Sequence, residues 1–275
     1  MASFTTSDGL EIFFSDSGAG VPLLCLPGLT RSTVDFQYVS PHLPGCRLIK
    51  MDYRGRGQSQ WDSDWRNYSL AVEGRDVLEL LDHLGLAQVA ILGTSRGGLN
   101  AMGLAKIAKA RLLGVALNDI GPVLEPAGLA GIETFIGRNP AARTHAEAAS
   151  GLAHIMTGFQ DVPEGRWLQE AKTHFKTSPQ GGLEITYDPC LRDAVLAQGQ
   201  KGLPDLWPFF DAMKGLPLAC IRGENSDLLS DQTLREMARR RPDMVVATVP
   251  GRGHIPFLDE PQSVAALHRW LEQLQ

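Results

Sequence analysis

The sequence lacks the features that mark several large classes of protein. Only 4 of its 275 residues are cysteine, and no two of them form a Cys-x-x-Cys pair. Scattered cysteines indicate neither a disulfide framework nor a zinc or redox motif, and Cys25 and Cys220 are expected to be small core residues. No apolar run reaches the length that a membrane-spanning helix needs. The first eight residues contain neither a basic nor an apolar segment, so we expect no secretory signal, no membrane partner and a cytoplasmic location.

A basic surface is also missing. The formal net charge is −5, and the longest basic run, Arg239 to Arg241, is expected to end a helix just before Pro242. Nucleic acid is therefore not an expected partner. The 7 histidines show no metal-ligand spacing such as H-E-x-x-H, and no G-x-G-x-x-G opens a helix after the first buried strand. We expect neither a metal nor another cofactor.

The chain is organised around the stretch Val89 to Leu99. The apolar run Val89 to Leu92 predicts a buried strand, and Gly93-Thr-Ser-Arg-Gly97 separates it from a helix of small residues. A G-x-S-x-G pattern between a strand and a helix is typical of a nucleophile elbow. The serine of an elbow has a strained backbone, and side chains in place of its two glycines would collide with the strand–helix crossing. Ser95 is therefore the candidate nucleophile, at a helix N-terminus that favours developing negative charge.

Strand and helix patterns alternate along most of the chain. Each expected central strand is an unbroken apolar run, which indicates a mostly parallel sheet covered on both faces. The expected strands are residues 3–7, 10–16, 21–26, 47–51, 89–92, 113–117, 216–221 and 245–249. The expected helices are residues 70–84, a segment that begins after Ser95, and residues 233–240 and 261–275.

The alternation stops between Pro122 and Lys214. We predict a core of residues 1–121 and 215–275 and a helical lid of residues 122–214. The lid is rich in aromatic residues, most of which are expected to pack within the lid or against the core. The alternative is that some of them line an apolar binding pocket, for which Phe135 and Trp167 are the candidates.

Two further strand ends carry the residue types that activate a serine. Asp227 follows the strand at 216–221, and His254 follows the last strand. Because the carboxyl ends of parallel strands meet at one edge of a sheet, Ser95, Asp227 and His254 are expected to form a triad there. His254 would move the proton and Asp227 would fix the imidazole tautomer. Asp119, at the end of the strand 113–117, is the alternative acid, or else a cap at the start of the lid.

The same edge provides candidates for an oxyanion hole. We assign the backbone N–H of Arg96, after the nucleophile, and that of Leu29, in a glycine loop after the first buried strand. Thr30, Arg31 and Ile255 are further candidates for the pocket. The side chains of Arg31 and Arg96 either favour an acidic substrate or, as we prefer, form salt bridges on the loops or lid.

Together these motifs resemble the α/β-hydrolase superfamily, and within it the lid-bearing bacterial hydrolases of esters, lactones and carbon–carbon bonds. The resemblance covers essentially the whole chain and implies an α/β-hydrolase fold, with a mostly parallel eight-stranded sheet, flanking helices and an inserted lid. The serine nucleophile disfavours the related dehalogenases and epoxide hydrolases, which use aspartate. Pro27 stands where many relatives have histidine, and Ile255 stands where ring-cleavage hydrolases often have tryptophan. The motifs that carry the resemblance are Leu26 to Leu29, Asp52 to Ser59, Gly93 to Gly98, Arg222 to Asp227 and Gly251 to His254.

The sequence thus predicts a serine hydrolase that cleaves a small or medium carboxylic ester or lactone through an acyl-enzyme. Its partner is a small-molecule substrate, and the sequence leaves monomer and homodimer equally open. The alternative within enzymes is hydrolysis of a carbon–carbon bond in a vinylogous diketone. Acyl transfer to peroxide or an alcohol is another. From a different class, the same fold serves as a ligand-binding protein with vestigial turnover.

Overall fold

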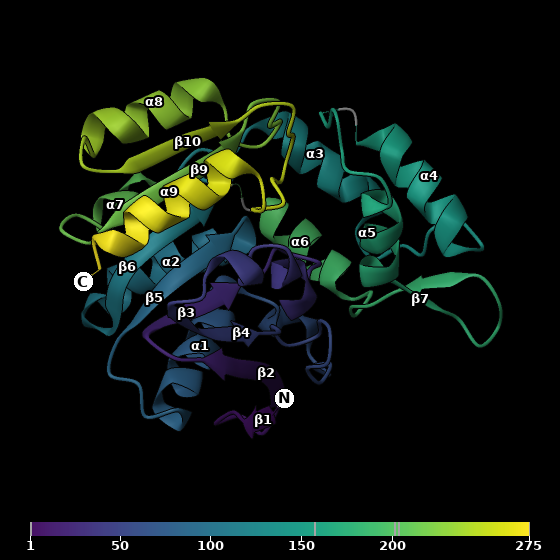
Figure 1. Cartoon of the computed structure of the whole chain (residues 1–275). Coiled ribbons are helices and arrows are strands. Elements are labelled where there is room, and N and C mark those ends of the chain that lie inside the picture. The colour runs from purple at the N-terminus through teal and green to yellow at the C-terminus, as the bar shows by residue number, and fades with distance from the viewer. Residues whose placement is uncertain (1, 157, 201, 203, 275) are drawn as a thin grey trace.

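The computed structural model contains an eight-stranded sheet, and the predicted strand positions are confirmed with small shifts. It describes residues 2–156, 158–200, 202 and 204–274. The strands of this sheet are β1 (Ala2–Thr5), β2 (Glu11–Gly18), β3 (Val21–Leu26), β4 (Cys46–Met51), β5 (Val89–Thr94), β6 (Leu112–Asn118), β9 (Leu218–Gly223) and β10 (Val245–Val249). Their order is β1-β2-β4-β3-β5-β6-β9-β10 (Figure 1).

Most strand pairs are parallel. Among the described residues of this eight-stranded sheet, only β1 with β2 and β2 with β4 run antiparallel, so the predicted mostly parallel sheet is confirmed. Among the shifted boundaries is the start of β9, which lies at Leu218 rather than at residue 216. Pro217 has no N–H to donate, and its carbonyl oxygen accepts from Val115 at 2.9 Å. Because pairing with a neighbouring strand needs backbone N–H donors, β9 starts only after the proline.

Helices cover the sheet, and they begin and end close to the predicted positions. The α-helices of the core are α1 (Leu70–His83), α2 (Arg96–Ile107), α8 (Asp231–Arg240) and α9 (Pro261–Glu272). Short 3-10 helices are η1 (Thr33–Gln37), η2 (Ser40–His42), η3 (Trp65–Asn67) and η4 (Lys109–Arg111). None of the helices formed by the described residues combines the length and apolar character that a membrane crossing requires.

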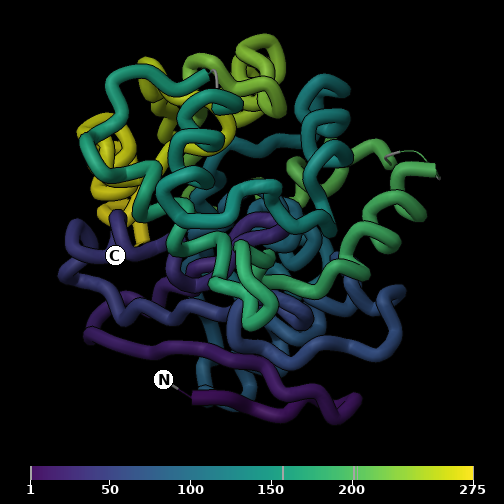
Figure 2. The backbone as a smooth tube through the Cα atoms, turned by 90° about the vertical axis from the view of Figure 1, so that its right-hand side faces the viewer, coloured from purple at the N-terminus to yellow at the C-terminus, as the bar shows by residue number. Residues whose placement is uncertain are grey.

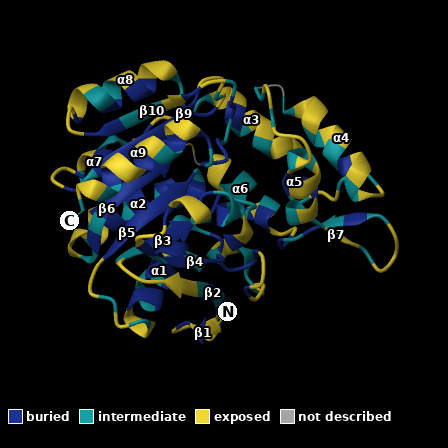
Figure 3. Ribbon diagram, viewed as in Figure 1, coloured by how far each residue is buried: buried dark blue, intermediate teal, exposed yellow. Residues whose placement is uncertain are grey.

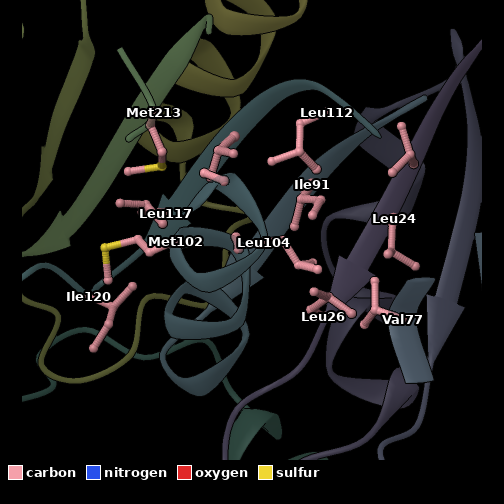
Figure 4. Close-up of a cluster of buried hydrophobic side chains, with 14 of the residues drawn as sticks. Leu24, Leu26, Val77, Ile91, Met102, Leu104, Leu112, Leu117, Ile120 and Met213 are labelled. Atoms are coloured by element: carbon pink, nitrogen blue, oxygen red, sulfur yellow. The ribbon is translucent and has the colours of Figure 1, made fainter. Parts of the chain in front are cut away.

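The sheet has an apolar layer on each face, because successive side chains of a strand point to opposite sides. In β3, Leu24 and Leu26 belong to the buried cluster that contains residues of α1 and α2, whereas Leu23 and Cys25 belong to the cluster that contains residues of η1 and α9. The central strands β5 and β9 are accordingly buried throughout, whereas β1 and the end of β2, at the edge of the sheet, are largely exposed (Figure 3). Figure 4 shows the first layer, in which Ile91 and Leu117 of neighbouring strands lie against α2. Burial raises the pKa of the Cys25 thiol to about 12.

The segment between β6 and β9, residues 122–214, is called here the inserted segment. Figure 1 shows α3 to α6 together on one side of the molecule, and Figure 2, which looks onto that side, shows them in front of the sheet. The short hairpin of β7 and β8 was not predicted, and α7 packs against α2. Its elements are α3 (Pro126–Phe135), α4 (His145–Ile155), α5 (Arg166–His174), β7 (Phe175–Thr177), β8 (Leu183–Ile185), α6 (Leu191–Gly199) and α7 (Trp207–Asp211).

Candidate active site

Ser95 lies at the sharp turn between β5 and α2. Its φ of 49° and ψ of −111° fall in a region that L-residues rarely adopt, as expected for an elbow. A Cβ added to Gly93 would lie 2.6 Å from the backbone carbon of Gly97, and one added to Gly97 would lie 2.1 Å from the carbonyl oxygen of Leu26. The two glycines are therefore required by close approach of the backbone, which confirms the prediction made from the motif.

We expect Gly97→Ala to lower the free energy of unfolding by at least about 2 kcal/mol, because strand and helix must separate to admit the methyl group. Gly103→Ala is the matched control, since Gly103 lies in the same helix and a Cβ there would meet nothing within 4 Å. This control is expected to be neutral or to stabilise the protein by up to about 1 kcal/mol. Urea unfolding of the two variants measures the difference. Equal stabilities would contradict the steric argument.

His254 connects Ser95 to a buried carboxylate. Its Nε2 lies 3.0 Å from Ser95 Oγ, and its Nδ1 lies 2.7 Å from Asp119 Oδ2. With the proton on Nδ1, His254 donates to Asp119 and accepts from the serine hydroxyl, which is the tautomer that a general base requires. The Asp119 side chain is fully buried and that of His254 is 19% exposed. The hydrogen-bonded chain therefore runs from solvent-accessible serine and histidine to a carboxylate shielded from water.

The structure corrects the prediction that Asp227 is the partner of His254. Asp227 follows β9 but is exposed, and its carbonyl oxygen, 3.1 Å from the N–H of Gly128, joins the turn to α3. No hydrogen bond of the Asp227 carboxylate is found among the described residues. The alternative named from the sequence, Asp119, occupies the place instead. Its φ of 55° turns its side chain towards His254 at the end of β6.

Two neighbours hold the Asp119 carboxylate in this position. Oδ1 accepts from the backbone N–H of Gly223 at 2.8 Å, and Oδ2 accepts from the hydroxyl of Ser226 at 2.6 Å. Sequence reasoning missed Ser226, because it examined the strand end after β9 only for a carboxylate. The signal was present in the Arg222 to Asp227 motif, one residue before the aspartate that we chose. The loop after β9 thus orients the acid rather than supplying it.

A partly enclosed pocket lies near the elbow, and both the core and the inserted segment contribute to it. Ser95 and His254 are not among its lining residues, but their chain neighbours Thr94 and Ile255 are. Thr94 and Asn118, the last residues of β5 and β6, lie at the sheet end of the pocket. Trp167 packs edge-on against Phe159 and Phe257, with ring centroids 5.5 and 6.1 Å apart. The other lining residues are Arg31, Asp35, Phe36, Tyr38, Leu152, Met156, Glu170, His174, Ile255, Pro256 and Leu258.

The structure places Arg31, Trp167 and Ile255 in this pocket but not Thr30 or Phe135. In the loop after β3, the N–H of Arg31 donates to the carbonyl oxygen of Gly28 at 3.2 Å, and this turn directs Arg31 rather than Thr30 to the pocket. Phe135 ends α3 and is 50% exposed, because the next residue, Ile136, occupies the buried position. The predictions that Thr30 and Phe135 line the pocket are therefore wrong.

Both arginines are engaged in salt bridges, as we preferred from the sequence. Arg31 Nη1 lies 3.1 Å from Glu170 Oε2 and 3.3 Å from Asp35 Oδ2, and it also contacts the ring of His174. Arg96 Nε lies 2.7 Å from Glu73 Oε2, deep beneath the elbow. Burial disfavours the charged form of Arg31, but the neighbouring carboxylates of Asp35 and Glu170 outweigh this effect and raise the pKa of the guanidinium above its ordinary value. Arg96 therefore does not reach the pocket, and Arg31 reaches it already paired.

The loop after β3 lies directly against the elbow. A Cβ added to Gly28 would lie 3.9 Å from Ser95 Cβ, so the loop that contains Leu29 approaches the nucleophile. Neither the N–H of Leu29 nor that of Arg96 donates a hydrogen bond to a protein group in the described part of the chain. The same residues contain no group of three or more His, Cys, Asp or Glu side chains that could hold a metal ion.

Comparison with known proteins agrees with this geometry. The family model described as alpha/beta hydrolase fold matches residues 21–261. A 3-hydroxybutyrate-oligomer hydrolase of Cupriavidus necator is 34% identical over 252 residues, covering 88% of this chain and 85% of that protein. A 2-(acetamidomethylene)succinate hydrolase of Mesorhizobium japonicum is 26% identical over 242 residues, covering 87% and 83%.

A solved structure extends the similarity to nearly the whole chain. An alpha/beta hydrolase from Novosphingobium aromaticivorans superposes with a TM-score of 0.91 at 36% identity, covering 99% of this chain and 97% of that one. The family model alone spans well over half of the sequence. This chain belongs to the alpha/beta hydrolase fold family and is a hydrolase.

Proposed function

We propose that this hydrolase cleaves carboxylic esters through an acyl-enzyme, with Ser95 as nucleophile, His254 as proton carrier and Asp119 as the acid. The observation that carries the proposal is the hydrogen-bonded chain of 3.0 Å from Ser95 to His254 and 2.7 Å from His254 to Asp119. His254 takes the serine proton as Ser95 attacks the carbonyl carbon, and returns it to the leaving alcohol. Water then enters, loses a proton to His254 and releases the acid.

In this proposal the tetrahedral intermediate is stabilised by the N–H groups of Leu29 and Arg96. Donors that are preorganised for a developing oxyanion carry much of the catalysis of acyl transfer. Support comes from the packing of Gly28 against Ser95 and from the absence of a protein acceptor for these two N–H groups within the described residues. No cofactor takes part in any of these steps.

The pocket favours a short acyl chain that carries a hydroxyl group. Its lining includes the apolar side chains of Phe159, Trp167 and Ile255 and the charged side chains of Arg31, Asp35 and Glu170. The two carboxylates outnumber the one guanidinium, so these side chains together disfavour a substrate carboxylate, and the carboxylate oxygens can accept a hydrogen bond from a substrate hydroxyl. The similarity to a 3-hydroxybutyrate-oligomer hydrolase supports hydroxyacyl esters as the substrate class. The inserted segment, which supplies Trp167 and Glu170, would act as the lid.

The test combines active-site labelling with turnover. A fluorophosphonate should add one equivalent to Ser95 in the wild-type protein and none in His254→Ala, as measured by intact-protein mass spectrometry. The p-nitrophenyl ester of 3-hydroxybutyrate should be turned over many times, with a higher kcat/KM than the ester of butyrate and a much higher one than the monoester of succinate. A single turnover would favour a ligand-binding protein. Turnover of a vinylogous diketone alone would favour carbon–carbon hydrolysis.

A further inference from the structure

Three charged side chains from different segments meet in the interior behind the elbow. Arg56 comes from the loop after β4, Glu73 from α1 and Arg96 from the first turn of α2, and their exposed fractions are 0%, 0% and 6%. Glu73 Oε1 lies 2.9 Å from Arg56 Nη2, and Glu73 Oε2 lies 2.7 Å from Arg96 Nε. Asn100 also donates to Glu73 Oε2, at 3.1 Å. Glu73 is therefore hydrogen-bonded to Arg96 and forms an ion pair, without a hydrogen bond, with Arg56.

Each arginine connects this cluster to one side of the candidate oxyanion hole. Arg56 Nε donates to the carbonyl oxygen of Leu29 at 3.0 Å, and Arg56 Nη1 donates to the carbonyl oxygen of Arg54 at 2.7 Å. Arg96 itself carries the second candidate N–H, and its Nη2 donates to the carbonyl oxygen of Tyr68 at 3.2 Å. Glu73 thus links the Leu29 segment, through Arg56, to the Arg96 segment. These two segments carry the candidate donors and must stay in register around an oxyanion.

The cluster also carries an excess of positive charge. Two guanidinium groups face one carboxylate, and the other acidic side chain buried on α1, Asp76, is bound to Arg54 and Arg75 instead. Burial lowers the pKa of Arg56 from its ordinary value, but an arginine remains protonated in proteins. The two arginines lower the pKa of Glu73, against the effect of burial. A fixed positive charge in a low-dielectric interior stabilises negative charge that develops nearby.

We propose that Arg56 and Glu73 are positioning residues for the oxyanion hole: they hold the Leu29 and Arg96 segments together and place net positive charge behind both donors. This inference rests on the proposed ester hydrolysis, because it concerns the stabilisation of that reaction's intermediate. Neither side chain touches the substrate, so the effect is expected on the transition state rather than on substrate binding.

The test compares Glu73→Gln with a matched control, Asp76→Asn. Both carboxylates are buried in α1, and each binds an arginine of the loop after β4. The partner of Asp76 is Arg54, whose side chain binds the carboxylates of Asp8, Asp62 and Asp76. Glu73→Gln breaks the link between the two arginines but leaves more positive charge behind the donors, so it tests the holding of the two segments in register, and its loss of kcat should be about 10- to 100-fold with KM nearly unchanged. The same variant should lower the affinity for a boronic acid by the same factor, because a boronic acid forms an anionic tetrahedral adduct with the serine. Asp76→Asn should lower the melting temperature but leave kcat and boronate affinity within about threefold.

Arg56→Met serves as a second variant with the same expected split between kcat and KM. Equal kcat losses in Glu73→Gln and Asp76→Asn, or boronate affinities that stay at the wild-type value, would overturn the inference and leave the proposed function intact. If wild-type protein showed neither labelling of Ser95 nor turnover, the proposed function would fail, and this inference with it. If Glu73→Gln did not fold, Arg56→Met would decide by the same two measurements.

Discussion

Asp119→Asn is expected to lower kcat for ester hydrolysis roughly 10,000-fold, whereas Asp227→Asn should leave it within a few-fold. The carboxylate of Asp119 accepts the Nδ1 proton of His254 at 2.7 Å. An amide at this position presents an N–H₂ group to Nδ1, which favours the tautomer with its proton on Nε2. That tautomer cannot accept the serine proton, so the general base is lost while the packing is kept.

Several features make this substitution a clean one. Asparagine tolerates the positive φ of 55° found at Asp119, and its oxygen can still accept from the N–H of Gly223. The fold should therefore remain, as thermal denaturation would show. Steady-state hydrolysis of a p-nitrophenyl ester measures kcat for both variants. A large loss in Asp227→Asn, with Asp119→Asn near wild type, would mean that the acid changes its identity in the working enzyme.

Ser95→Ala is expected to cause the largest loss of all, about a million-fold in kcat. The hydroxyl is the proposed nucleophile, and its oxygen lies 3.0 Å from His254 Nε2. Without it no acyl-enzyme forms, and only the weak catalysis of the remaining oxyanion donors is left. Labelling by the fluorophosphonate should disappear together with turnover.

The fold of the Ser95→Ala variant should be preserved, because alanine meets the same backbone strain as serine at a φ of 49°. The melting temperature should change by only a few degrees. Ser226→Ala is an informative comparison, since it removes a different hydroxyl that binds the Asp119 carboxylate at 2.6 Å. Its kcat should fall by no more than about 100-fold, the worth of one hydrogen bond to a charged group. If Ser95→Ala kept the activity of the wild-type protein, the nucleophile would have to be another residue.

The proposed oxyanion hole suggests why this chain carries an arginine after its nucleophile. The Arg96 side chain does not enter the pocket but binds Glu73 beneath the elbow. Glu73 also binds Arg56, whose Nε holds the loop after β3 through the carbonyl oxygen of Leu29. In this arrangement the residue after the nucleophile contributes twice, with its N–H towards the substrate and its side chain towards the interior. In the proposed function, substrate selection falls to Arg31, Asp35 and Glu170, which line the pocket.

Much of this protein followed from local patterns in the sequence. The unbroken apolar runs predicted the parallel strands, because a strand covered on both faces buries every side chain. The elbow followed from Gly93, Ser95 and Gly97, since only glycine leaves room where the helix crosses the strand. His254 followed from its place directly after the last strand, at the edge where the carboxyl ends meet. Each of these features depends on residues that are neighbours in the chain.

Tertiary structure alone decided the partner of His254 and the lining of the pocket. Asp119 and Asp227 both follow strand ends, and β6 and β9 are adjacent in the sheet, so position along the chain favoured neither. The choice came from backbone direction: the positive φ at Asp119 turns its carboxylate inwards, whereas the turn after β9 leaves Asp227 in solvent. Phe135 was misplaced for a similar reason, because the end of α3 buries Ile136 in its stead. Where a side chain points depends on dihedral angles and on partners over a hundred residues away, and a one-dimensional pattern of residue types records neither.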